Sequence, residues 1–217
     1  MKAGAIFDMD GTLFDTEKLY RKAWLSVAPE FGVEPNLDLP IAACGTNMGE
    51  ESVRVVERFY PHIDCKRYVA RVLELVEVDR EKGLSLMTGV DEILNFFRDA
   101  GVRMAVASSA PVALIEDNLS RKNLRGYFDV LVGGDMVAHG KPAPDIFLLA
   151  ASKLKLAPAD CYIFEDSFNG IRAAHSAGGA AIMIPDTMQP TDEIKALCTG
   201  VFVNLSEART AIEHGDI

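Results

Sequence analysis

Short runs of apolar residues recur along this chain, and most are followed by a segment with the spacing of an amphipathic helix. Several runs are apolar at successive positions, which is typical of parallel strands that are covered on both faces. The runs lie at residues 3–7, 104–107, 130–132, 162–164 and 180–184, with 201–203 as a candidate edge strand. This alternation predicts an α/β fold built on an open, doubly wound, mostly parallel Rossmann-like sheet.

One long interval departs from the alternation. Residues 15–87 contain no convincing strand, and their apolar side chains recur at helical spacing. The two clearest helical faces carry Tyr20, Ala23, Trp24 and Val27, and then Tyr68, Val69, Val72, Leu73 and Val76. A connection of about 70 residues is much longer than an ordinary crossover between strands. We therefore predict that an α-helical subdomain, residues 15–87, is inserted into an α/β core formed by residues 1–14 and 88–217.

The charge of the chain restricts its partners. The 217 residues include 22 Lys+Arg and 32 Asp+Glu, which gives a formal net charge of −10. Nucleic acids and anionic membranes bind proteins mainly through neutralised negative charge, so we expect neither as a partner. No run of about 18 apolar residues is present, and we expect no membrane span. A small phosphate ester remains compatible, because a local site can be positive within a negative protein.

The cysteines indicate the compartment. The chain has 4 cysteines, widely scattered and without a C-x-x-C pair. This layout favours free thiols in a reducing compartment, with one or two structural disulfides in an exported protein as the alternative. The first apolar run is too short for a signal peptide. We expect a cytoplasmic protein.

The first predicted strand ends in two carboxylates, Asp8 and Asp10, which point to the same side of an extended chain. Gly11 then permits a sharp turn and a close approach of the backbone to a ligand. Two unit charges about 4 Å apart repel by about 4 kcal/mol at an effective dielectric near 20, so the pair calls for a cation or a shared proton. A strand that simply ends in a polar turn is the alternative.

Three further strand ends carry polar groups. Ser108 and Ser109 precede a helix start, where a hydroxyl and backbone N–H groups form an anion site. Lys141 lies in a proline-rich loop, and Glu165 and Asp166 form a second acidic pair. Each group also has an ordinary explanation, which is a helix cap for the serines and the acidic pair and a solvated side chain for the lysine.

Taken together, the four strand ends favour a single site. In an open α/β sheet, ligands bind beyond the C-terminal ends of the strands, where these groups would meet. Carboxylates from two loops suit Mg²⁺, which binds through a few carboxylates and substrate phosphate. The set predicts phosphoryl transfer, in which the protein positions the reactants and stabilises charge.

These segments make the chain resemble the haloacid dehalogenase (HAD) superfamily. The matching pieces are Phe7-Asp8-Met9-Asp10-Gly11-Thr12-Leu13, Ala107-Ser108-Ser109, Lys141-Pro142 and Phe164-Glu165-Asp166-Ser167, in the order of the family's four motifs. Residues 140–147 and 165–174 resemble the β-phosphoglucomutase/sugar-phosphatase branch, which carries a helical cap after the first motif. The resemblance spans nearly the whole chain.

The resemblance implies a Mg²⁺-dependent phosphomonoester hydrolase that forms an aspartyl phosphate on Asp8. Asp10 would protonate the leaving oxygen and then deprotonate the attacking water. The Asp8 side chain, the Asp10 backbone carbonyl and Asp166 would hold Mg²⁺. Glu165 would act on the metal through water or from outside its direct ligands.

The same resemblance implies how the phosphoryl group is bound. Ser108, the Ser109 amide and the backbone at Gly11 would hold its oxygens, and Lys141 would offset its charge. The helical cap would exclude water and select the substrate, with Thr16, Tyr20 and the loop at 44–49 as candidate contacts. Thr16 as an ordinary helix cap and Tyr20 as a core residue are the alternatives.

The main alternative activity is that of β-phosphoglucomutase. Where the mutase has a histidine in its first cap helix this chain has Tyr20, and residues 45–49 offer no basic side chain to grip a second phosphate. Both departures favour hydrolysis. Dehalogenation is disfavoured, because Asp10 serves acid–base chemistry on phosphates. A phospho-accepting signalling receiver is disfavoured by Asp10 beside the phosphorylated residue and by the large helical insertion. A degenerate family member that only binds is disfavoured by the complete acidic set.

The sequence leaves the phosphate ester open. A sugar phosphate such as 2-deoxyglucose 6-phosphate, glycerol phosphate or a nucleotide monophosphate would suit a helical cap of this size, and we expect a sugar phosphate. Proteins of this branch are usually monomeric, so we also expect a monomer.

Overall fold

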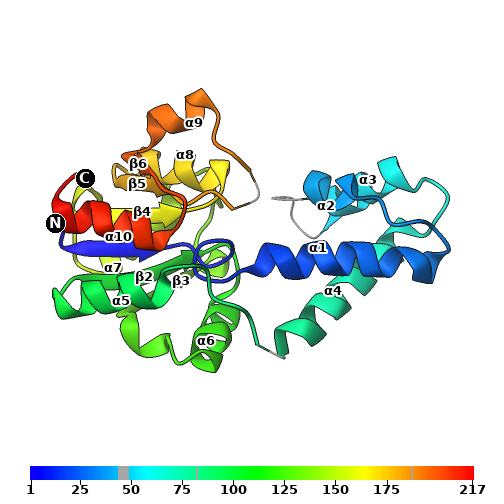
Figure 1. The fold of residues 1–217 in the computed structure, drawn as a ribbon, viewed down its shortest axis with the longest axis horizontal. Helices are drawn as coiled ribbons and strands as arrows, with labels where there is room; N and C mark the ends of the chain where they lie inside the picture. Colours follow the sequence, from blue (N-terminus) through cyan, green and yellow to red (C-terminus); the bar gives the residue numbers. More distant parts are fainter. Residues whose placement is uncertain (44–48, 82, 187) are drawn as a thin grey trace. The chain divides into compact units, whose positions relative to one another are not determined.

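The computed structural model describes residues 1–43, 49–81, 83–186 and 188–217. These residues include a six-stranded sheet of order β3-β2-β1-β4-β5-β6, in which neighbouring strands are parallel (Figure 1). The strands are β1 (Gly4–Phe7), β2 (Arg103–Ser108), β3 (Val130–Gly133), β4 (Cys161–Glu165), β5 (Ala180–Met183) and β6 (Gly200–Val201). The predicted open parallel α/β sheet is confirmed.

Helices cover both faces of this sheet, which explains why its strands are apolar at successive positions. The helices of the sheet unit are α5 (Val90–Asp99), α6 (Val112–Arg121), α7 (Asp145–Lys153), α8 (Phe168–Ser176), α9 (Asp192–Leu197) and α10 (Leu205–His214). On the face packed by α7 and α8, Ile6 and Ile163 join a core of mostly aliphatic side chains. On the other face Phe7 stacks on Phe164 with ring centroids 4.6 Å apart, and Phe97 of α5 lies edge-on to Phe7 at 6.2 Å.

The strand register aligns the ends of the three central strands. Phe7, the last residue of β1, pairs with Val106 of β2 and with Phe164 of β4. The residues that follow these partners in the chain therefore lie side by side at one edge of the sheet. Asp8 continues the pairing, since its N–H donates to the Phe164 carbonyl at 2.9 Å.

A second compact unit comprises Asp15–Leu84. Its helices are α1 (Thr16–Val27), α2 (Asp38–Ala43), α3 (Glu50–Phe59) and α4 (Cys65–Glu81). α1 packs on α4, where Trp24 stacks on the fully buried Tyr68 and the Tyr68 hydroxyl donates to the Trp24 carbonyl at 2.6 Å. Leu73 was expected on the buried face of α4 but is 37% exposed, because it lies about 100° round the helix from the buried Val72.

The first unit comprises Met1–Phe14 and Ser85–Ile217. Its second segment thus begins before the predicted position 88. The reason is long-range pairing, since Leu86 forms an antiparallel bridge with Phe14 and the Met87 N–H donates to the Leu13 carbonyl at 3.0 Å. These contacts tie the returning chain to the loop after β1.

The far edge of the sheet is shorter than expected. β6 consists of Gly200 and Val201 alone, whereas residues 201–203 were the predicted strand. The Phe202 N–H still donates to the Met183 carbonyl, but Val203 is 74% exposed and lies outside the strand. In the part of the chain that the structure describes, no helix is both long and apolar enough to cross a bilayer.

The buried hydroxyl of Tyr68 generates a stability prediction. Tyr68→Phe should lower the free energy of unfolding by about 1–2 kcal/mol, because the Trp24 carbonyl loses its partner inside the core. Urea unfolding of the full chain measures the change. Tyr127→Phe is the matched control, because its hydroxyl donates to Asn95 in a part-buried position and should cost less than half as much. Equal losses in the two variants would contradict the assignment.

Candidate active site

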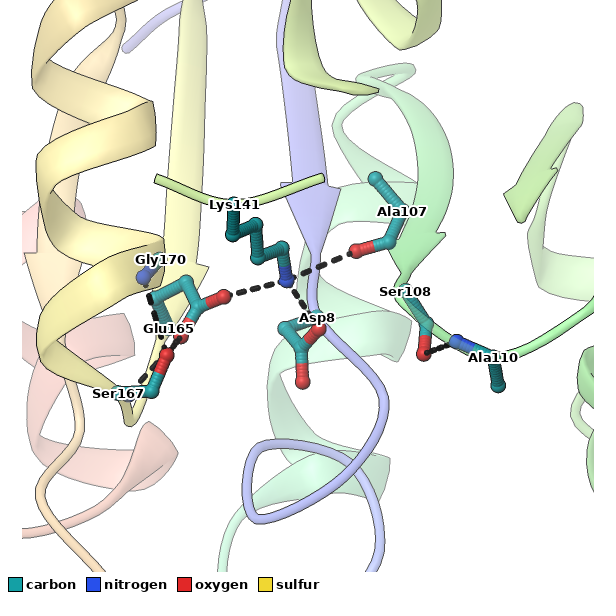
Figure 2. A network of polar contacts seen from close by, with 8 residues as sticks. All are labelled: Asp8, Ala107, Ser108, Ala110, Lys141, Glu165, Ser167 and Gly170. Atoms are coloured by element: carbon teal, nitrogen blue, oxygen red, sulfur yellow. Dashed lines mark hydrogen bonds and ion pairs between the residues drawn. The ribbon is translucent and has the colours of Figure 1, made fainter. Parts of the chain in front are cut away.

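The site begins with an ammonium group buried between two carboxylates. Lys141 Nζ lies 2.5 Å from Asp8 Oδ1 and 2.5 Å from Glu165 Oε1, and it also donates to the Ala107 carbonyl at 3.4 Å (Figure 2). The side chains of Lys141, Asp8 and Glu165 are 7%, 8% and 1% exposed. Since Asp8 follows β1 and Glu165 ends β4, the lysine of the loop before α7 joins two neighbouring strand ends.

The loops after β1 and β4 also touch directly. A Cβ atom added to Gly11 would lie 2.3 Å from Asp166 Oδ2, so the Asp166 carboxylate rests against the backbone at Gly11. Gly11 has φ +75°, a conformation that other residues rarely adopt. A glycine is therefore required here twice, for the turn and for the approach of the carboxylate.

The charges of these groups perturb one another. Burial raises the pKa of Asp8 to about 8, and the charges of Glu165 and Asp10 act in the same direction, against the opposing effect of Lys141. Burial, followed by the charges of Glu165 and Asp8, holds the pKa of Asp166 well above its usual value. Burial alone would lower the pKa of Lys141, but Asp8 and Glu165 outweigh it, and that pKa is raised. One ammonium thus faces several carboxylates, which is an environment that attracts a further cation.

Glu165 is fixed by contacts on both of its oxygens. Oε1 accepts from Lys141, while Oε2 accepts from the N–H and the hydroxyl of Ser167, both at 2.9 Å. Ser167 in turn caps α8, because its Oγ accepts from the Gly170 N–H at 3.0 Å. Glu165 was predicted to act on a metal through water or from outside its ligands, and these contacts direct its carboxylate to Lys141 and the start of α8.

Gly170 is a site residue that the sequence reasoning missed. A Cβ atom there would lie 1.8 Å from Glu165 Cδ, so the Glu165 carboxylate occupies the space where a side chain would be (Figure 2). The available signal was a glycine inside a helical pattern, which costs stability unless packing requires it.

Ser108 ends β2 and is buried, at 1% exposed. Its Oγ accepts from the Ala110 N–H at 3.1 Å, which leaves the hydroxyl proton to donate elsewhere. Ser109 is exposed. The Val112 N–H at the start of α6 donates to Asp135 Oδ1 at 3.1 Å.

The predicted metal ligands are not all side chains. Among the described residues, no three His, Cys, Asp or Glu side chains gather closely enough to hold a metal by themselves. The predicted set differs from such a cluster, because Asp10 would contribute its backbone carbonyl beside the carboxylates of Asp8 and Asp166. Mg²⁺ typically binds through one or two carboxylates and completes its shell with water and phosphate oxygens, so these donors fit the ion.

The remaining predicted contacts lie in the helical unit. Thr16 is the first residue of α1, and Tyr20 is partly buried against the hydrophobic core of that unit. Tyr20 is therefore at least a packing residue. In the predicted loop at 44–49, residues 44–48 lie outside the described part of the chain.

Comparison with known proteins points to one family. The model of the haloacid dehalogenase-like hydrolases matches residues 3–178. The fructose-1-phosphate phosphatase YqaB of Escherichia coli K12 is 36% identical over 181 residues, covering 83% of this chain and 95% of that protein. A phosphorylated carbohydrates phosphatase of Thermotoga maritima is 37% identical over 173 residues, covering 80% of each. A candidate β-phosphoglucomutase of Thermotoga maritima superposes with a TM-score of 0.83 at 31% identity, covering 99% of both chains.

The close packing of Glu165 against Gly170 can be tested by a double-mutant cycle. Replacement of a glycine by alanine inside a helix normally stabilises the helix by up to about 1 kcal/mol. Gly170→Ala should instead destabilise the protein by about 1–3 kcal/mol, because its methyl group overlaps the Glu165 carboxylate. In a Glu165→Ala background the same exchange should become neutral or favourable. Urea unfolding of the four proteins measures the coupling, and an equal cost in both backgrounds would refute the steric argument.

Proposed function

Because the chain belongs to the haloacid dehalogenase-like hydrolases, we propose that its strand-end site hydrolyses a small phosphorylated carbohydrate through an aspartyl phosphate on Asp8, with Mg²⁺. The observation that supports this most is the buried Lys141 ammonium between Asp8 and Glu165. A cation fixed beside a buried carboxylate suits a nucleophile that must receive a phosphate dianion.

The chemistry proceeds in two displacements at phosphorus. An Asp8 carboxylate oxygen forms the new bond to phosphorus while the bond to the ester oxygen breaks, and Asp10 donates its proton to that leaving oxygen. Asp10 then takes a proton from a water molecule that attacks phosphorus. The bond to Asp8 breaks, inorganic phosphate leaves, and both carboxylates return to their starting states.

The phosphoryl group is held by donors at two strand ends. The Ser108 hydroxyl, oriented by the Ala110 N–H, donates to one phosphoryl oxygen, and the Ser109 N–H and the backbone at Gly11 serve the others. Lys141 balances charge between Asp8 and the incoming phosphate. Such fixed donors cost little reorganisation when charge develops in the transition state.

Mg²⁺ would be held by the Asp8 and Asp166 carboxylates and the Asp10 carbonyl. When bound, it supplies positive charge that offsets the carboxylates and polarises the phosphoryl oxygens. The close seat of Asp166 against Gly11 supports this set, because it brings the loop after β4 to the loop that carries Asp8 and Asp10.

The helical unit, Asp15–Leu84, serves in this proposal as the cap that excludes water and selects the ester. Thr16 and Tyr20 of α1 are its proposed substrate contacts.

Relatives named for fructose 1-phosphate and for phosphorylated carbohydrates support a sugar phosphate as substrate. The likeness to a candidate β-phosphoglucomutase keeps phosphotransfer within a sugar phosphate as the second activity to test. The cytoplasm as compartment and the monomer as assembly state stay predictions from the sequence.

Replacement of the nucleophile gives the first functional test. Asp8→Asn should lower phosphate release by at least about a thousandfold, because the amide cannot form the acyl phosphate. Phosphate release is measured over a panel of sugar phosphates that includes fructose 1-phosphate. Asp117→Asn, which loses only an exposed ion pair with Arg121, is the control and should retain wild-type turnover. Substantial activity of Asp8→Asn would refute the mechanism.

Metal removal gives the second test. Treatment with EDTA should abolish turnover, and added Mg²⁺ should restore it, because the dianionic substrate must otherwise approach a cluster of carboxylates. The measurement is phosphate release before and after dialysis. Full activity in EDTA would contradict the proposed cofactor.

Conversion of β-glucose 1-phosphate into its 6-phosphate isomer without phosphate release would establish the mutase activity in place of hydrolysis.

A further inference from the structure

We propose that Gly133, Gly134 and Asp135, hereafter the β3 clamp, set the position of the Ser108–Ser109 phosphate loop, with Asp135 as a positioning residue. The inference rests on the proposed function, since it concerns how that function's phosphate-binding groups are held. None of the three residues belongs to the four motifs from which the site was predicted.

The clamp lies beside the loop because of the sheet register. Ser108, the last residue of β2, pairs with Gly133, the last residue of β3. The chain then turns into a short 3₁₀ helix, Gly134–Met136, which runs past the loop that leaves β2. The residues at the end of the edge strand therefore lie against the backbone of Ser109, Ala110 and Val112.

Two hydrogen bonds join the clamp to the segment after Ser108, and a third joins that segment to the Ser108 hydroxyl. The Gly134 N–H donates to the Ala110 carbonyl at 3.0 Å, and Asp135 Oδ1 accepts from the Val112 N–H at 3.1 Å. The Ala110 N–H, in turn, donates to Ser108 Oγ at 3.1 Å. Both backbone polar groups of Ala110 are thus engaged, its carbonyl by the clamp and its N–H by the hydroxyl that is proposed to bind phosphate.

The two glycines are required by space. Gly133 has φ −102° and ψ 163°, a conformation open to any residue, so its backbone angles do not explain it. A Cβ atom at Gly133 would lie 2.5 Å from the Val112 nitrogen and 2.7 Å from the Ala110 oxygen. One at Gly134 would lie 2.4 Å from the Ser109 oxygen. These obstacles are backbone atoms, so any side chain here would push the phosphate loop away.

Asp135 supplies a cap that α6 lacks. The residue before α6 is Pro111, which makes no side-chain cap bond to the helix. The first helical N–H, that of Val112, is instead satisfied from the end of the next strand. A carboxylate at a helix start also interacts favourably with the helix dipole. Loss of this cap would loosen the first turn of α6 and the loop that precedes it.

A variant set separates positioning from plain stabilisation. Asp135→Ala removes the cap, Asp135→Asn keeps an acceptor, and Asn204→Ala is the matched control. Asn204 caps α10 beyond β6, at the opposite edge of the sheet, by accepting from the Glu207 N–H at 3.0 Å. Steady-state turnover, competitive inhibition by inorganic phosphate, thermal midpoints and amide hydrogen exchange are measured on the full chain with Mg²⁺.

Asp135→Ala and Asn204→Ala should lower the thermal midpoint alike, because each loses one helix cap. Only Asp135→Ala should raise the inhibition constant of phosphate and lower kcat/KM, each by about tenfold, the equivalent of one cap interaction. Asp135→Asn should stay within about twofold of wild type, since its side-chain oxygen can still accept. Gly134→Ala should reproduce the loss of phosphate affinity and serves if Asp135→Ala fails to fold.

Hydrogen exchange tests the clamp without catalysis. The amides of Ala110 and Val112 should exchange faster in Asp135→Ala than in wild type or Asn204→Ala. Unchanged exchange there, or faster exchange with unaltered phosphate inhibition, would overturn the proposal. A wild-type protein that releases phosphate from no ester would overturn the proposed function instead, while the exchange result would still report on the clamp.

Discussion

The strand-end site depends on a single buried cation. Lys141 reaches from the loop before α7 to the ends of β1 and β4, and its side chain is almost wholly removed from water. A buried charge is tolerated only when it is paired, and loss of one partner typically costs about 3–5 kcal/mol. Lys141 has two such partners, Asp8 and Glu165, and Glu165 is itself held by Ser167. The ammonium therefore determines where the proposed nucleophile lies.

The same arrangement leaves negative charge in excess. Burial and neighbouring carboxylates raise the pKa of Asp8 and of Asp166, so each carboxylate makes its neighbour harder to ionise. In the proposed reaction Asp8 must be ionised and must also accept an anion. A bound divalent ion would favour the ionised form of Asp8 and would also attract the phosphate anion. The donor set and the proposed chemistry therefore point to the same ion.

The architecture could be predicted because its signals are local. Runs such as 162–164 are apolar at successive positions, and the polar residues that follow them must meet at one edge of a parallel sheet. The rest depends on contacts between distant segments. The space at Gly170 exists because of the path of the Glu165 side chain, and Asp135 caps a helix that begins 23 residues earlier in the chain. The return of the chain at Leu86 is likewise fixed by Phe14, which no local pattern reveals.

The central place of β1 has a consequence for biosynthesis. β1 is synthesised before both of its neighbouring strands, and one of them, β4, begins only at Cys161. At about 5–20 residues per second, the nascent chain waits on the order of ten seconds for that partner. During this interval an apolar strand has an open edge, a template for unwanted pairing. Chaperone protection between the synthesis of β1 and that of β4 would therefore matter more for this chain than for one whose first strand pairs only with a strand close to it in the sequence.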